Sequence, residues 1–89
     1  IALADLQNIV EFFKHPSNEY PLTPRHEPDS DDPDDELVTK FKILQRYNRV
    51  NLVVPVDEEH MYFAAMNSKA CKLTALGVHY WNLARKGRI

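Results

Sequence analysis

The chain has 89 residues, with 11 lysines and arginines against 13 aspartates and glutamates, four histidines and one cysteine. This length suits one small domain, so we expect a single domain over residues 1–89. One cysteine excludes an internal disulfide and a cysteine-based zinc cluster. No apolar run approaches the roughly 20 residues that cross a bilayer, and no secretory signal segment opens the chain. We therefore expect no membrane insertion and an intracellular location, cytoplasmic or nuclear, and the start at Ile1 suggests a fragment or a processed product.

Charge is divided unequally along the chain. Residues 1–36 carry ten acidic and two basic side chains, whereas residues 37–89 carry nine basic and three acidic ones. The two parts therefore have formal charges of −8 and +6. This asymmetry indicates an acidic arm attached to a basic module that attracts phosphate groups or an acidic partner. The alternative is an ordinary surface on which the charges mix once the chain has folded.

An N-terminal helix and an acidic loop are predicted first. Apolar residues at helical spacing from Leu3 to Phe13 predict an amphipathic helix within residues 1–15, which Pro16 ends. Residues 16–35 hold five of the six prolines and seven acids, which is typical of a mobile loop. Because a loop of this length is uncommon in a small domain, it either contains a short helical turn or is an insertion.

The aspartates of this loop do not match a calcium site. The sequence from Asp29 to Glu36 lacks the glycine and the alternating ligands of an EF-hand loop, and Pro33 falls at a ligand position. The four histidines are scattered, and no pair has the spacing of a metal site on one helix. We therefore expect no metal and no cofactor. Ser30 is a candidate phosphorylation site.

Residues 36–49 form the second predicted helix. Leu37, Phe41 and Leu44 mark its apolar face. The opposite stripe is polar and basic and contains no acid. This basic stripe consists of Thr39, Lys42, Arg46 and Arg49.

A β-hairpin is predicted after this helix. Residues 50–56 are rich in β-forming side chains, and Pro55 places its part of the strand at an edge or an end. The polar residues 57–60 then provide the connection to a second strand over 61–66. After a turn or bulge, residues 70–73 continue extended.

The last predicted helix covers residues 74–86. Thr74 is a suitable N-cap, and Gly87 suits the position after the helix end. Cys71, just before this helix, is expected to be a small buried hydrophobe. The expected core draws on every predicted element: Leu3, Leu6, Val10, Phe13, Leu37, Phe41, Leu44, Leu52, Val54, Phe63, Leu73, Leu76, Tyr80 and Leu83.

Leu73, Thr74 and Gly77 form a Leu-Thr-x-x-Gly pattern that follows a predicted strand and opens a helix. Together with the basic helix and the hairpin before it, this pattern resembles the winged-helix superfamily over residues 37–86. Regulators of the MarR and PadR type show the pattern where the returning wing strand meets the C-terminal helix. The resemblance implies an α+β fold with three helices packed on a short antiparallel β-hairpin.

The basic stripe is the leading candidate for a binding site. If the helix over 36–49 resembles a recognition helix, its stripe faces the major groove of duplex DNA, where arginine reads guanine edges and lysine reaches phosphates. Arg85 and Lys86 either contact phosphate or only complement the end of the last helix. The first hypothesis is therefore a non-catalytic nucleic-acid-binding module, with the acidic loop as its modulator.

The alternative is a protein-interaction or oligomerisation domain of a larger protein. The acidic wing tip, residues 57–59, favours this class because a wing near phosphates is expected to be basic. Tyr80 and Trp81 are the candidate interface residues, in a homodimer or with another protein. We expect no catalysis and no small-molecule substrate, because two glycines do not build a phosphate-binding loop and the cysteine has no positioned histidine.

Overall fold

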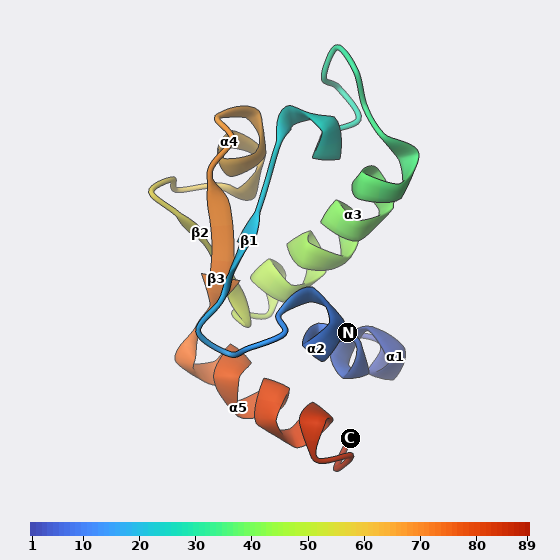
Figure 1. Ribbon diagram of the computed structural model, residues 1–89, viewed down its shortest axis with the longest axis vertical. Helices are drawn as coiled ribbons and strands as arrows, with labels where there is room; N and C mark the ends of the chain where they lie inside the picture. Colours follow the sequence, from blue (N-terminus) through green and yellow to red (C-terminus); the bar gives the residue numbers. More distant parts are fainter.

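A three-stranded antiparallel sheet and six helical segments make up the computed structural model, which describes residues 1–89 (Figure 1). The general α+β class expected from the sequence is therefore present. In chain order the elements are α1 (Leu3–Gln7), α2 (Ile9–Phe12), β1 (Glu19–Pro21), the 3-10 helix η1 (Pro24–His26), α3 (Asp35–Arg49), β2 (Val53–Val56), α4 (Met61–Met66), β3 (Ala70–Leu73) and α5 (Ala75–Arg85).

The sheet has the strand order β1-β3-β2, so β3 is the central strand. Cys71 at its centre is paired in register with Tyr20 on one side and Pro55 on the other. Pro21 and Pro55 lie in the two edge strands, where a residue without an N–H group does least harm to the hydrogen-bond ladder. The edge position predicted for Pro55 is confirmed, and Cys71 is fully buried as expected.

The first predicted helix is present as α1 and α2, which meet at Asn8. This residue keeps a nearly helical backbone, with φ −75° and ψ −3°, so the two segments follow each other closely. Ile9 and Phe13 are the buried residues of this region, whereas Leu3 is 59% exposed. The buried face of α1 and α2 therefore includes Ile9 and not the predicted Leu3.

The acidic loop contains β1 and η1, so the predicted short helical turn is present. Leu22 and His26 are buried, and η1 packs against α3. Asp34 caps α3, because its Oδ1 atom accepts a hydrogen bond from the N–H group of Leu37 at 3.1 Å. Helix α3 begins one residue before the predicted boundary and ends where predicted, at Arg49.

The predicted second strand of the hairpin is wrong, because residues 61–66 form the helix α4. Met61, Ala64 and Ala65 follow the i, i+3, i+4 spacing of one helix face and are buried. Methionine and alanine favour a helix whereas tyrosine and phenylalanine favour a strand, so local propensity is divided and the packing of this face selects the helix. Strands β2 and β3 still pair antiparallel, but a connection that contains α4 replaces the simple hairpin turn.

Helix α5 confirms the predicted caps. The hydroxyl oxygen of Thr74 accepts a hydrogen bond from the N–H group of Gly77 at 2.9 Å, and Gly87 follows the helix with φ +68°. The inward face is shifted from the predicted one, because Gly77 and Trp81 are buried, Tyr80 and Leu83 are half-buried, and Leu76 is 42% exposed. None of the helices combines the length and the apolarity needed to span a membrane.

The core consists of side chains from nearly every element. Five of the buried core residues were predicted: Phe13, Phe41, Leu44, Leu52 and Leu73. Tyr47 and Trp81 add the largest aromatic surfaces that the prediction missed. The other predicted core residues are only half-buried or are exposed: Leu3, Leu6, Val10, Leu37, Val54, Phe63, Leu76, Tyr80 and Leu83.

Candidate functional site

The four side chains of the basic stripe are exposed on α3, as their helical spacing predicts. Lys42 and Arg49 are exposed and form no ion pair within the chain. The Nε atom of Arg46, by contrast, lies 3.0 Å from Oδ2 of Asp5 in α1. The Thr39 hydroxyl donates to the carbonyl oxygen of Asp35 at 3.0 Å. Two of the four side chains are therefore already engaged by the protein itself.

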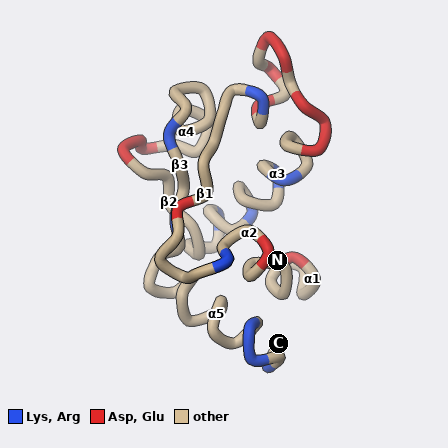
Figure 2. The backbone as a smooth tube through the Cα atoms, in the orientation of Figure 1, with Lys and Arg blue, Asp and Glu red and all other residues tan.

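The N-terminal end of α3 is surrounded by acidic residues (Figure 2). Asp34 caps the helix, and Asp35 and Glu36 occupy its first turn. Carboxylates stabilise this positive end of the helix dipole but repel phosphate groups. A polyanion would therefore meet only the C-terminal half of the basic stripe.

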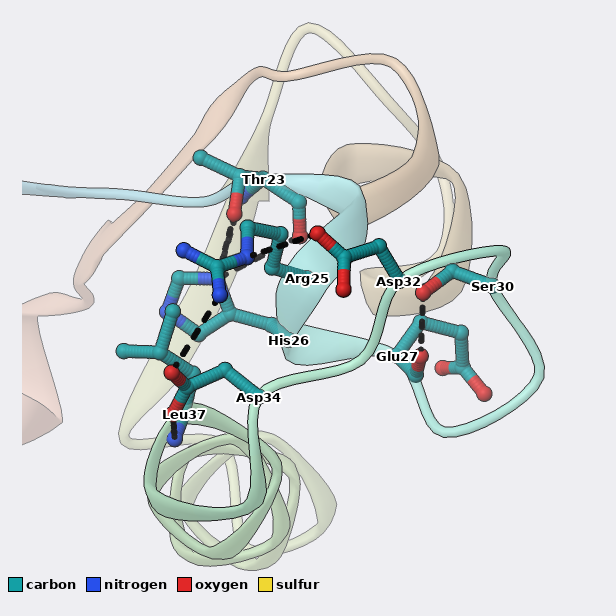
Figure 3. A network of polar contacts seen from close by, with 8 residues as sticks. All are labelled: Thr23, Arg25, His26, Glu27, Ser30, Asp32, Asp34 and Leu37. Atoms are coloured by element: carbon teal, nitrogen blue, oxygen red, sulfur yellow. Dashed lines mark hydrogen bonds and ion pairs between the residues drawn. The ribbon is translucent and has the colours of Figure 1, made fainter.

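Arg25 holds the acidic loop in a folded shape (Figure 3). Its guanidinium group lies 3.6 Å from Oδ2 of Asp32 and 3.5 Å from Oδ2 of Asp34. On the far side of the turn, the hydroxyl of Ser30 donates to the carbonyl oxygen of Glu27 at 2.7 Å. The carboxylates of Asp32 and Asp34 are thus paired with Arg25, not with the basic stripe. They do not converge on a metal site, since no group of three or more ligating side chains forms in the chain.

The two aromatic residues predicted for an interface have different positions. Trp81 is only 5% exposed, and its indole N–H donates to the carbonyl oxygen of Phe13. Arg85 covers the indole with its guanidinium carbon 5.7 Å from the ring centroid. Trp81 is thus a core residue, with little surface left for a partner, and its interface assignment is corrected. Arg85 and Lys86 are exposed at the end of α5.

Tyr80 lies at the surface and belongs to an apolar depression of about 170 Å³. The depression is formed by α1, the segment that follows α3, and the beginning of α5. Every side chain that lines it is apolar: Ile1, Leu6, Val50, Leu52, Leu76 and Tyr80.

Much of the exposed apolar surface of the domain gathers at this depression. Ile1, Val50 and Leu76 are exposed although they line it, and Leu3 is exposed on the adjoining helix. No motif in the sequence predicts this cluster, because its members come from positions 1 to 80 and only the fold brings them together. Contiguous exposed apolar surface in a small domain is typical of a contact with another molecule.

The largest cleft, of about 500 Å³, lies between α2, β1 and α3. Lys14 and Lys40 are among the residues that line it. Each is held by a neighbouring carboxylate, Lys14 by Glu11 at 2.9 Å and Lys40 by Glu36 at 3.3 Å. The hydrogen bond from Lys14 lowers the pKa of Glu11. The cleft therefore offers no unpaired positive charge for an anionic ligand.

Comparison with known proteins assigns no family to this fold. No protein-family model, no curated protein and no solved structure matches the chain. The function must therefore be argued from the basic stripe and the apolar depression.

Proposed function

We propose that this domain is a non-catalytic protein-interaction module that receives an apolar side chain of its partner in the depression between α1, the segment that follows α3, and α5. The observation that carries this proposal is the gathering of exposed Ile1, Val50 and Leu76 around one depression that only hydrophobic residues line. Covering apolar surface contributes roughly 25 cal/mol for each Å² removed from water. An anchor in a pocket is also the usual centre of a protein interface.

The experiment places a photo-cross-linking amino acid at position 76 and, as a control, at position 82. Both positions lie on exposed parts of α5, but Asn82 is not part of the depression. We expect position 76 to cross-link one defined protein in cell extract and position 82 to miss it. Val50→Ser should reduce the yield at position 76, because it removes an apolar wall while leaving the buried core intact.

Equal cross-linking at positions 76 and 82, or yields that Val50→Ser does not change, would contradict the proposal. A circular dichroism melt of each variant checks that the fold is kept. Light scattering on the purified chain shows whether the partner is a second copy.

Nucleic-acid binding through the basic stripe is the second candidate. We infer a winged-helix-like arrangement from the element order, with η1 in the place of the middle helix and α3 leading through β2 to β3 and α5. The unpaired cations Lys42 and Arg49 support this candidate, whereas the ion pair of Arg46 and the acids at the start of α3 weaken it.

A salt titration with random duplex DNA separates the two candidates. If the stripe binds phosphates, Lys42→Ala with Arg49→Ala will reduce the slope of log affinity against log salt by about 2. We expect instead only weak binding, with a slope that the double variant leaves unchanged. Tight binding that depends on both residues would favour the second candidate.

A further inference from the structure

The outer face of α4 carries two exposed aromatic residues. Tyr62 and Phe63 are 42% and 47% exposed, and their rings meet edge to face with the centroids 5.3 Å apart. His60 stands next to Phe63, with the ring centroids 6.1 Å apart. A helix that buries one face normally presents polar side chains to water on the other. The buried residues of α4 account for its packing on the sheet, but its outward aromatic residues contribute little to that packing.

Three carboxylates stand directly before this helix, in the connection that projects from the sheet (Figure 2). Asp57, Glu58 and Glu59 form no ion pair. The Oε1 atom of Glu58 accepts a hydrogen bond from the side-chain amide of Asn67 at 3.0 Å, which leaves its charge uncompensated. In the acidic loop before α3, by contrast, Arg25 pairs with two of the carboxylates, those of Asp32 and Asp34. This second acidic segment thus lacks a cation of its own.

We propose that the surface formed by Asp57, Glu58, Glu59, His60, Tyr62 and Phe63, here called the α4 surface, docks an arginine-rich segment of a partner protein. The carboxylates attract the guanidinium groups, and the exposed rings offer faces on which these planar cations stack. An acidic or neutral apolar segment would leave the carboxylates unpaired. The negative charge of the α4 surface therefore favours a partner segment rich in arginine.

The α4 surface is independent of the apolar depression. Helix α4 packs on β2, β3 and η1, whereas α1 and α2 pack on α5. In Figure 1, α4 lies in the upper half of the molecule, whereas α1 and α5 lie in the lower half. One domain can therefore hold two different segments, and this inference does not rest on the proposed function.

Fluorescence anisotropy with a labelled peptide of eight arginines tests the proposal on the whole chain. We expect Tyr62→Ser with Phe63→Ser to weaken binding about five- to thirty-fold, the sum expected for two exposed cation–π contacts. Asp57→Asn with Glu59→Gln should weaken it in the same direction. NMR shift changes in the unmodified protein should concentrate on residues 57–66. A peptide of eight glutamates should not bind.

The matched control is Asp29→Asn with Asp31→Asn, which removes the same charge from the other acidic segment. Its affinity for the arginine peptide should stay within about two-fold of the unmodified protein. The proposal is overturned if the shift changes centre on residues 29–36, if both charge variants lose affinity equally, or if the aromatic variant binds like the unmodified protein. Absence of any binding at low salt also overturns it. The NMR map of the unmodified protein decides the case even if the aromatic variant fails to fold.

Discussion

The backbone of Leu52 lies so close to Gly77 that a Cβ atom on residue 77 would stand 2.0 Å from the Leu52 carbonyl oxygen. Thr74 joins the same segment, since its N–H group donates to the Leu52 carbonyl at 3.0 Å and its hydroxyl donates to that of Asn51 at 2.6 Å. The Leu-Thr-x-x-Gly pattern therefore has a physical explanation here. Its threonine caps α5 and its glycine lets α5 approach the chain just after α3.

Gly77→Ala is expected to destabilise the domain by about 3 kcal/mol, because the added methyl group overlaps a backbone carbonyl that cannot rotate away. Urea unfolding followed by circular dichroism measures the change. Gly87→Ala is the matched control. Nothing lies within 4 Å of its added Cβ, so it should lose only the roughly 1 kcal/mol that a left-handed backbone costs alanine. Equal losses in the two variants would contradict the close-packing argument.

Trp81→Phe is expected to lower the free energy of unfolding by about 2 kcal/mol. The change removes the indole N–H that donates to the Phe13 carbonyl and leaves a buried acceptor unpaired. Tyr80→Phe is the control, and its effect should stay below about 0.5 kcal/mol because the half-buried ring is kept and the Tyr80 hydroxyl forms no hydrogen bond within the chain. Unfolding must be followed by circular dichroism, since Trp81 is the only tryptophan. A loss no greater than that of Tyr80→Phe would show that the hydrogen bond from Trp81 to Phe13 does not stabilise the fold.

The stability of the domain should depend on pH through His26. This ring is buried between Tyr20 and Phe41, and the N–H group of Thr23 donates to its Nδ1 atom at 3.1 Å. Burial lowers the pKa of His26 below its ordinary value of 6.5. Lys40 acts in the same direction, whereas the Thr23 backbone and the nearby Asp34 act in the opposite one.

Because the unfolded chain then binds a proton that the folded chain does not, the free energy of unfolding should be highest above pH 6.5 and decrease as the pH falls below it. Urea titrations between pH 5 and 8 measure this change. His26→Gln should flatten the profile, while His79→Gln, at an exposed position, should keep it. Identical profiles for the unmodified protein and His26→Gln would contradict the assignment.

Cys71 should be unreactive in the folded protein. It is fully buried in the central strand, and burial raises the pKa of its thiol to about 12. Since the thiolate is the reactive form, a thiol reagent such as dithionitrobenzoate should label almost no Cys71 at pH 8 without denaturant. One equivalent should react after unfolding in urea. Complete labelling of the native protein within seconds would show that the strand is accessible.

The features that depend on neighbouring residues could be predicted from the sequence alone. The helical periodicity of residues 36–49, the cap at Thr74 and the edge position of Pro55 were all predicted, because each follows from local backbone chemistry. The exposed basic stripe was predicted for the same reason. The ion pair that neutralises Arg46 of this stripe was not predicted, since Asp5 reaches Arg46 only after α1 has packed on α3.

The remaining features depend on contacts between distant parts of the chain. Residues 61–66 are a short apolar run that suits a strand or a helix, and burial of Met61, Ala64 and Ala65 against the sheet selected the helix. The contact between Gly77 and Leu52 then decided which face of α5 turns inward. It left Leu76 and Tyr80 to line the apolar depression. Such contacts join residues far apart in the chain, so their free energy does not appear in any local pattern of sequence.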